Sequence, residues 1–214
     1  MYTLIDMVMI VLVLTNLILL GTSRLRTCIE LIAIQGIALG VLPLLVHGES
    51  LGFEPIVFSA IIITLKGVVF PWVLVRALSQ LNVRREVEPF VGYGVSLILG
   101  PLALASCLWI GSRLPLPGET VSTMSVPVGL FTMMAGLFLI VSRKKALTQV
   151  MGYLVLENGI NAMGVAIAKE QPYLVELGIL LDVFVAVFVM GIIIFHINRE
   201  FDHIDTDQMS SLRS

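Results

Sequence analysis

Residues 2–20 read YTLIDMVMIVLVLTNLILL, a run of nineteen residues whose single charged side chain is Asp6. A helix of this length extends about 28 Å, and the hydrocarbon core of a bilayer is about 30 Å thick. No basic leader precedes the run and no small-residue cleavage site follows it. We therefore expect a retained membrane span rather than a removed signal peptide.

Apolar runs of this kind recur along the chain. Of its 214 residues, 57% are hydrophobic and 13% are charged, and the mean hydropathy is +1.01. Soluble domains have about 25% charged residues, so this chain has too few polar side chains to cover a water-soluble globule. The sequence predicts an all-α integral membrane protein with about seven transmembrane helices. The predicted spans are Tyr2–Leu20, Cys28–Val46, Pro55–Leu74, Val91–Ile110, Ser125–Val141, Ala146–Ala168 and Leu174–Ile197.

We expect a single membrane domain over residues 1–214 that contains two similar three-helix units. Similar basic turns, Ser23–Arg26 and Ser142–Lys145, precede corresponding spans, and Lys66 and Asp182 lie at similar distances after a proline. The alternative is coincidence, because basic turns recur in any helical membrane protein. The predicted parts are an N-terminal three-helix unit over 1–78, a linking helix over 90–112, a C-terminal three-helix unit over 125–198 and a cytoplasmic tail over 199–214.

Basic residues gather in alternate connections between the predicted spans. One side of the membrane holds ten of them, whereas the other holds Arg113 and Lys169. Positive charge stays in the cytoplasm during insertion, so we expect the N-terminus outside and the C-terminus inside a prokaryotic plasma membrane. The ten residues are Arg24, Arg26, Arg76, Arg84, Arg85, Arg143, Lys144, Lys145, Arg199 and Arg213.

Three charged residues, Lys66, Glu157 and Asp182, lie deep within predicted spans. A charge near the bilayer centre costs at least about 2.5 kcal/mol on insertion scales, and the side chain of Lys66 is too short to reach either interface. Asn158 follows Glu157, and Asn161 lies one turn further on the same helix face as Glu157. The pattern favours a proton-translocation site formed by Glu157, Asp182 and Lys66, which the two asparagines support. The alternative is a structural ion pair of Lys66 with one of the carboxylates.

Weaker candidates lie elsewhere in the spans. Glu30 lies near the cytoplasmic end of the second span, where water can solvate it, and Gln35 lies deeper in the same span. We place both among the supporting polar residues, although an uncharged Gln more often joins helices. Asn16 in the first span is positioned to hydrogen bond to a neighbouring helix.

Small residues and a proline predict features of the packing. Gly36 and Gly40 form a Gly-x-x-x-Gly pair in the second span, and Gly159 and Gly164 lie in the sixth. Glycines let helix backbones approach closely, so we expect tight contacts there. Pro71, five residues after Lys66, should kink the third span or free backbone carbonyls in it.

Catalytic and cofactor motifs do not occur in the sequence. It has no Walker loop, nucleophile triad, dinucleotide fingerprint or Cys/His cluster, and Cys28 and Cys107 fall in different apolar runs, where they suit packing. We expect no cofactor, metal, haem or iron–sulfur cluster, and no catalytic chemistry in this chain alone. The net charge of −2 argues against a nucleic-acid partner.

The sixth predicted span resembles a known sequence pattern. The stretch GYLVLENGINA over residues 152–162, which follows an apolar helix and a basic turn, resembles the small K-type subunit of respiratory complex I. In the Gly-Leu-Glu-x-x-x-Asn-Ala pattern of that family, Glu157, Asn161 and Ala162 match, while the residues before Glu157 match loosely. Asp182 is the nearest counterpart of the family's second buried glutamate. The whole chain, with Lys66 in the third span, looks more like membrane component E of hydrogenase-4 and formate-hydrogenlyase-type hydrogenases.

This resemblance implies a non-redox membrane subunit of an energy-converting, complex-I-like oxidoreductase. Such a subunit would lie in the lipid bilayer beside antiporter-like membrane subunits, with peripheral redox subunits as indirect partners. It would contribute buried charges to proton or sodium translocation. The alternatives are the C-type subunit of a multisubunit cation/proton antiporter, which normally has about three spans, a structural membrane scaffold, and a stand-alone transporter.

Overall fold

A computed structural model describes residues 2–46, 53–80, 89–114, 122–167 and 191 of the chain. These residues are helical apart from short connections, and no strand occurs among them. The helices are α1 (Tyr2–Gly21), α2 (Leu25–Val46), α3 (Phe53–Ile62), the π-helix η1 (Ile63–Val69), α4 (Phe70–Gln80), α5 (Tyr93–Arg113), α6 (Ser125–Ser142) and α7 (Ala146–Ile167).

The first five predicted spans are helices long and apolar enough to cross a membrane. The sixth predicted span coincides with α7, which is not among those five, and the seventh, Leu174–Ile197, lies outside the described residues. The structure thus confirms an all-α membrane protein but not a count of seven spans. The five candidate spans are Thr3–Gly21, Leu25–Val46, Pro55–Ser79, Tyr93–Arg113 and Ser125–Ser142.

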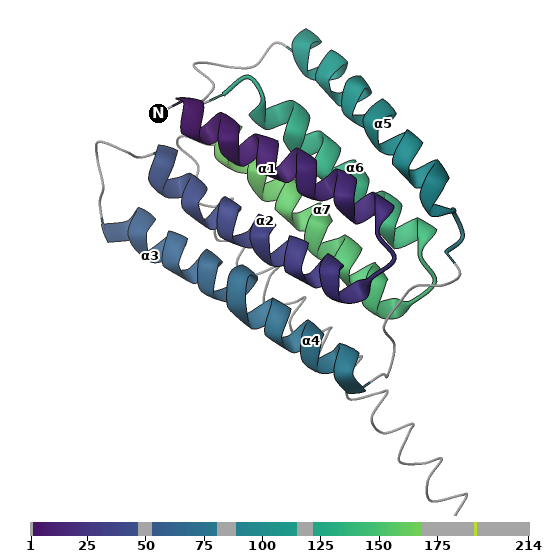
Figure 1. The fold of residues 1–214 in the computed structure, drawn as a ribbon. Coiled ribbons are helices and arrows are strands. Elements are labelled where there is room, and N and C mark those ends of the chain that lie inside the picture. Colours follow the sequence, from purple (N-terminus) through teal and green to yellow (C-terminus); the bar gives the residue numbers. More distant parts are fainter. Residues whose placement is uncertain (1, 47–52, 81–88, 115–121, 168–190, 192–214) are drawn as a thin grey trace, which may run out of the picture.

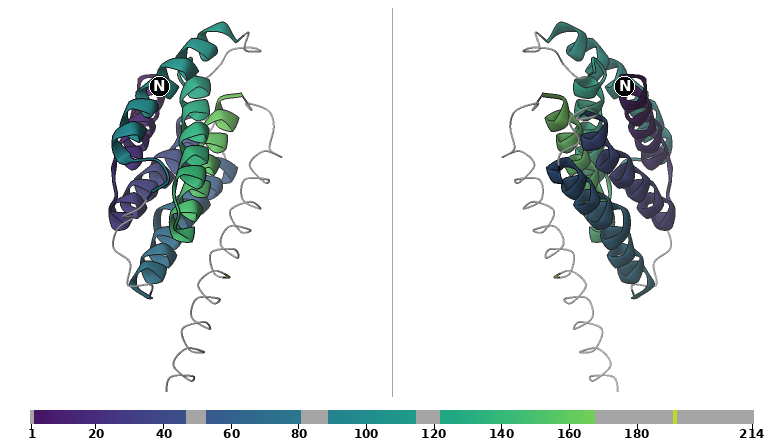
Figure 2. Two further views of the ribbon diagram at one scale, coloured as in Figure 1. Left: turned by 90° about the vertical axis from the view of Figure 1, so that its right-hand side faces the viewer. Right: turned by 90° about the vertical axis from the view of Figure 1, so that its left-hand side faces the viewer.

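The helices form two layers (Figures 1 and 2). In one layer α1, α2 and the continuous α3–η1–α4 segment lie side by side, and the α6–α7 hairpin packs across α1 and α2 in the other. Helix α5 lies at the edge of the bundle against α1 and α6. The centre is therefore formed by α1, α2, η1, α6 and α7.

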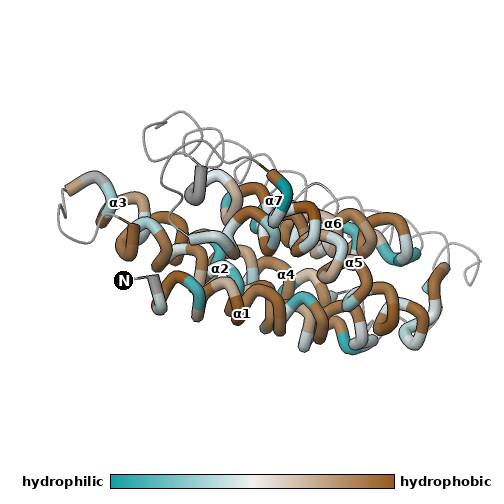
Figure 3. The backbone as a smooth tube through the Cα atoms, turned by 90° about the horizontal axis from the view of Figure 1, so that it is seen from above, coloured by the Kyte–Doolittle hydropathy of each residue, from teal (hydrophilic) through white to brown (hydrophobic). Residues whose placement is uncertain are grey.

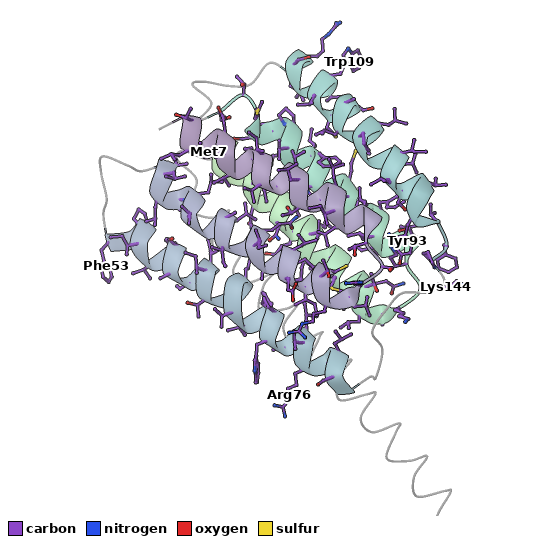
Figure 4. All side chains as sticks on the ribbon, in the orientation of Figure 1. Met7, Phe53, Arg76, Tyr93, Trp109 and Lys144 are labelled. Atoms are coloured by element: carbon purple, nitrogen blue, oxygen red, sulfur yellow. The ribbon has the colours of Figure 1, made fainter. Side chains whose placement is uncertain are left out.

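The outer surface of the bundle is apolar. Along α1 the exposed side chains include Met7, Leu14 and Ile18, and most of the tube is hydrophobic in Figure 3. Phe53 and Trp109 also point away from the bundle in Figure 4. Several polar side chains are instead buried inside. This distribution suits a protein whose solvent is lipid.

Reciprocal glycines join α6 and α7. A Cβ atom at Gly136 would lie 2.7 Å from the carbonyl oxygen of Gly152, and one at Gly159 would lie 2.8 Å from the carbonyl oxygen of Gly129. Real Cβ atoms essentially never come so close, so both contacts require glycine. The tight contact predicted at Gly159 is confirmed. At Gly164 an added Cβ would meet no atom of the described residues within 4 Å, so the close contact predicted there does not involve the described helices.

The Gly36/Gly40 pair of α2 packs closely against the third span. A Cβ atom at Gly36 would lie 2.9 Å from the carbonyl oxygen of Lys66, and one at Gly40 would lie 3.1 Å from the backbone nitrogen of Ile63. The predicted close approach is confirmed, and it holds η1 against α2. Because Lys66 lies in η1, these two glycines also bring Lys66 to the centre of the bundle.

The π-helix η1 directly precedes Pro71. It ends where the N–H of Phe70 donates to the carbonyl of Leu65, a five-residue step in place of the α-helical four. Pro71 has no N–H, and its ring would clash with the carbonyl of Gly67 in a regular α-helix. Widening the preceding turns avoids that clash. The distortion predicted at Pro71 thus takes the form of a π-helix that contains Lys66.

Candidate functional site

Lys66 and Glu157 form an ion pair inside the bundle. Nζ of Lys66 lies 2.8 Å from Oε1 of Glu157, and the two side chains are 4% and 1% exposed. Lys66 comes from η1 and Glu157 from α7, so the contact joins the two helical layers. Lys66 is eleven residues past Pro55 and Glu157 eleven past Ala146, about 16 Å along each helix. The pair therefore lies near the middle of a bilayer about 30 Å thick.

Two asparagines of α7 surround the pair. Lys66 also donates from Nζ to Oδ1 of Asn158, at 3.2 Å, and Nδ2 of Asn161 donates to Oε1 of Glu157, at 3.4 Å. Oε2 of Glu157 is buried and has no hydrogen-bond partner among the residues that the structure describes. One carboxylate oxygen is thus engaged by a cation and an amide, while the other is not.

A chain of side-chain amides continues from Asn158 into the other helices. Nδ2 of Asn158 donates to Oε1 of Gln35 at 3.2 Å, and Nε2 of Gln35 donates to Oδ1 of Asn16 at 2.8 Å. Nε2 of Gln35 also lies 3.0 Å from Oγ1 of Thr15. Nδ2 of Asn16 donates to Oγ1 of Thr132 at 2.8 Å, and that hydroxyl donates to a backbone carbonyl of α6.

We call this set the polar layer, because it crosses the bundle through α1, α2, η1, α6 and α7 at one depth. Six of its members are at most 3% exposed, Thr15 is 6% exposed and Asn161 is half-buried. Its members are Thr15, Asn16, Gln35, Lys66, Thr132, Glu157, Asn158 and Asn161.

The structure brings most of the predicted residues together. Lys66, Glu157, Asn158, Asn161 and Gln35 all belong to the polar layer. Of the two carboxylates proposed to pair with Lys66, Glu157 does so.

Two predicted residues are not in the described layer. The side chain of Glu30 is 62% exposed and lies 3.4 Å from Nε of Arg26, at the end of α2, so the structure places it away from the site. Water solvates such a position, as its place near the span end suggested. Asp182 lies outside the described residues.

Sequence reasoning missed the buried state of Arg143. This residue was counted as one more basic residue of a connection, yet it is 1% exposed. Its Nη2 donates to the carbonyl of Leu20 at the end of α1, at 3.1 Å, and its guanidinium lies 4.2 Å from the ring centre of Tyr93. Nothing in the sequence distinguishes it from the neighbouring Lys144 and Lys145. Thr132 was missed as well, because a single Thr in an apolar helix gives no signal.

The described residues offer no metal site. Among them, no group of three or more His, Cys, Asp or Glu side chains is placed to hold a metal ion. Cys28 on α2 and Cys107 on α5 are both buried, and no disulfide joins them in the described residues.

Comparison with known proteins finds one family model and several relatives that match this chain. The model of the family "NADH-ubiquinone/plastoquinone oxidoreductase chain 4L" matches residues 124–214, which include α6 and α7. The chain is 32% identical over 205 residues to the uncharacterized protein Rv0085 of Mycobacterium tuberculosis, covering 94% of this chain and 92% of that protein. Hydrogenase-4 component E of Escherichia coli and of Shigella flexneri are each 27% identical over 158 residues, covering 74% of this chain and 73% of theirs. No solved structure matches significantly.

The relatives cover most of the chain. The resemblance suggested by residues 152–162 is confirmed over a much longer stretch. With its apolar helices, the chain is a multi-pass membrane protein. It belongs to the same family as Rv0085 of Mycobacterium tuberculosis, it is homologous to hydrogenase-4 component E, and its C-terminal region matches the family model of NADH-ubiquinone/plastoquinone oxidoreductase chain 4L.

Proposed function

We propose that the chain is a non-redox membrane subunit of a complex-I-like, membrane-bound hydrogenase or formate-hydrogenlyase-type complex. In this assembly it contributes to proton translocation through Glu157, Lys66 and Asp182. The observation that carries the proposal is the Lys66–Glu157 ion pair in the middle of the bundle, with one carboxylate oxygen unengaged. The family relationship supports the assembly, since the chain 4L model and the component E relatives both name subunits of oxidoreductases.

The geometry of Glu157 suits proton uptake and release. Its Oε1 is held by Lys66 and Asn161, and its Oε2 has no described partner. A proton arriving at Oε2 neutralises the carboxylate without displacing either donor from Oε1. The charge left on Lys66 then favours release of that proton to the next carrier. A buried carboxylate beside a fixed cation is thus an exchangeable site rather than a permanent charge.

Asp182 is proposed as the next titratable group, on the strength of its place in the family pattern and its predicted depth. Antiporter-like membrane subunits are the proposed neighbours, and peripheral redox subunits the indirect ones. We also propose that the N-terminus faces outward and the C-terminus the cytoplasm, because basic residues gather at one end of the helices. Labelling of single cysteines placed at residues 2 and 210, from each side of sealed vesicles, tests this orientation.

The substitution Glu157→Gln tests the function. It keeps the size of the side chain and an oxygen for Lys66 and Asn161, but it cannot take up a proton. In the purified, reconstituted complex we expect normal assembly and a proton-transfer rate at least about tenfold lower, the scale on which one proton carrier contributes. Glu30→Gln is the matched control, since it makes the same chemical change at an exposed carboxylate outside the polar layer. Pumping and coupled turnover equal to wild type in Glu157→Gln contradict the proposal.

A structural scaffold is the second candidate, and the closeness of the ion pair favours it. A buried pair can be replaced by apolar side chains without loss of stability. The double variant Lys66→Met/Glu157→Leu separates the two functions: a scaffold keeps full coupling in this variant, whereas a proton carrier loses it. Mass spectrometry of the intact complex identifies the neighbours, and antiporter subunits without a redox module would indicate the antiporter alternative.

A further inference from the structure

The hydrogen bonds that lead from Lys66 through three amides to Thr132 all run in one direction. Lys66 donates to Asn158, Asn158 donates to Gln35, and Gln35 donates to Asn16. Asn16 donates to Thr132, whose hydroxyl donates to the carbonyl of Val128. The chain thus begins at a cation and ends at a backbone oxygen that has no proton to give. Reversing any one amide would set donor against donor or acceptor against acceptor, so the orientation of each amide is fixed by its neighbours.

Such a chain polarises its first acceptor. Each amide that donates onward becomes a better acceptor for the bond behind it, because hydrogen bonds in a low-dielectric interior strengthen one another. The effect gathers at Oδ1 of Asn158, which lies 3.2 Å from Nζ of Lys66. The ammonium group of Lys66 therefore has a strong neutral acceptor beside its carboxylate.

The same chain is a poor path for protons. An amide nitrogen neither releases its proton nor accepts another near neutral pH, unlike a carboxylate or a chain of waters. Asn158, Gln35 and Asn16 thus separate Glu157 from α1 and α6.

We propose that Gln35 and Asn16 are positioning residues for proton exchange at Glu157. They hold Oδ1 of Asn158 against Nζ of Lys66, so that the ammonium keeps its charge and its place when Glu157 takes up a proton at Oε2. They also close the α1–α6 side of the site to protons. This inference rests on the proposed function, and it adds the residues that regulate it.

Few other charges act on Glu157 from the described elements around it. Helix α6 carries no charged residue, and α2 carries only Arg26 and Glu30, which pair with each other in an exposed position near the helix end. Helix α7 itself carries no charge besides Glu157, and η1 contributes Lys66. A change in the amide chain therefore acts on Glu157 mainly through Lys66.

The test is the pH profile of proton transfer in the reconstituted complex. The part of this pH profile that reports protonation of Glu157, which we call the Glu157 limb, is the part that is missing in Glu157→Gln. Gln35→Met keeps the size of the side chain but makes no hydrogen bond, so Oδ1 of Asn158 becomes a weaker acceptor for Lys66. When Glu157 then takes up a proton, the ammonium charge of Lys66 is less well stabilised, and protonation of Glu157 is disfavoured. We expect this limb to move to lower pH by about one unit. The exchange variant Gln35→Asn/Asn158→Gln restores the combined length of the two amides and should return the limb towards its wild-type position.

A substitution at the far end of the hydrogen-bonded series provides a second test if the Gln35→Met variant does not assemble. Thr132→Val removes only the hydroxyl that accepts from Asn16, so we expect a smaller shift of the same sign, whereas Thr132→Ser keeps the hydroxyl and the wild-type limb. An unmoved limb in both Gln35→Met and Thr132→Val, or in Thr132→Val alone if Gln35→Met does not assemble, overturns the positioning role and leaves the proposed function standing. A wild-type profile in Glu157→Gln overturns the proposed function itself.

Discussion

The bundle buries two cations in different ways. Lys66 lies at mid-depth, where it contacts a carboxylate and an amide that come from α7. Arg143 lies at the end of α6, where it contacts a backbone carbonyl of α1 and the ring of Tyr93, and no described carboxylate forms an ion pair with it. Both are almost fully buried, and among the described residues only Lys66 has an ionised partner.

The difference separates an exchangeable charge from a fixed one. A lysine beside a carboxylate forms a pair that can gain or lose a proton, whereas a guanidinium keeps its charge at any physiological pH. The carbonyl of Leu20 belongs to the last turn of α1, where the helix dipole presents partial negative charge, and an aromatic face adds to it. Arg143 therefore joins the ends of helices, whereas Lys66 belongs to the pair for which we propose proton exchange.

Removing the carboxylate partner should give the largest effect. Glu157→Leu leaves a buried ammonium without its counter-charge, and we expect a loss of about 3–5 kcal/mol in the free energy of unfolding. Adding Lys66→Met should recover most of this loss, because no uncompensated charge then remains. Unfolding in detergent micelles, arranged as a double-mutant cycle, measures the coupling, and additive losses from the two substitutions would show that the contact in the structure carries no net interaction.

Removing the fixed cation should cost less. Arg143→Met loses a charged hydrogen bond and the contact with Tyr93, for which we expect about 2–3 kcal/mol. Arg143→Lys should recover only part of it, because an ammonium does not stack as a planar guanidinium does. The same unfolding assay applies, and the coupled proton-transfer rate should stay near wild type in Arg143→Lys. A proton-transfer defect as large as that of Glu157→Gln would erase the distinction between the two cations.

The α6–α7 hairpin links the two regions, and a small change there sharpens the comparison. Gly159→Ala places a methyl group 2.5 Å from the backbone nitrogen of Met133, so we expect a loss of about 1–2 kcal/mol from overpacking two residues from Glu157. Gly164→Ala, on the same helix, meets no described atom within 4 Å and should be neutral or slightly stabilising. Melting temperatures of the two variants test this difference. Equal values would show that α6 and α7 can move apart at Gly159 without loss of stability.

The sequence was sufficient to predict those features that depend on depth and periodicity. The apolar runs predict the helices, and the cost of burying Lys66 and Glu157 makes them stand out in any such run. From the sequence, Glu157 and Asp182 were equally possible partners of Lys66. Glu157 is 91 residues away along the chain, and the arrangement of the helices in space decides the pairing. The Gly36/Gly40 pair predicted a close contact without naming Lys66 as its neighbour.

Other parts of the site depend on tertiary contacts that leave no trace in a single sequence. Asn16 and Gln35 were recognised as polar residues that join helices, but the order of the chain through Thr132 follows from how α1, α2 and α6 pack. The burial of Arg143 likewise comes from the position of α5, which brings Tyr93 over it. The π-helix was foreseen only as a disturbance near Pro71, because the choice between a kink and a wider turn depends on the contact with α2.

The separation of Lys66 from Glu157 has a consequence for biosynthesis. A ribosome adds about 5–20 residues per second, so the 91 residues between them take roughly 5–18 seconds to emerge. During that interval Glu157 cannot yet compensate the charge of Lys66, so insertion of the third span carries a cost of about 2.5–3.5 kcal/mol. The later arrival of α7 offsets this cost by bringing the carboxylate of Glu157 to Nζ of Lys66.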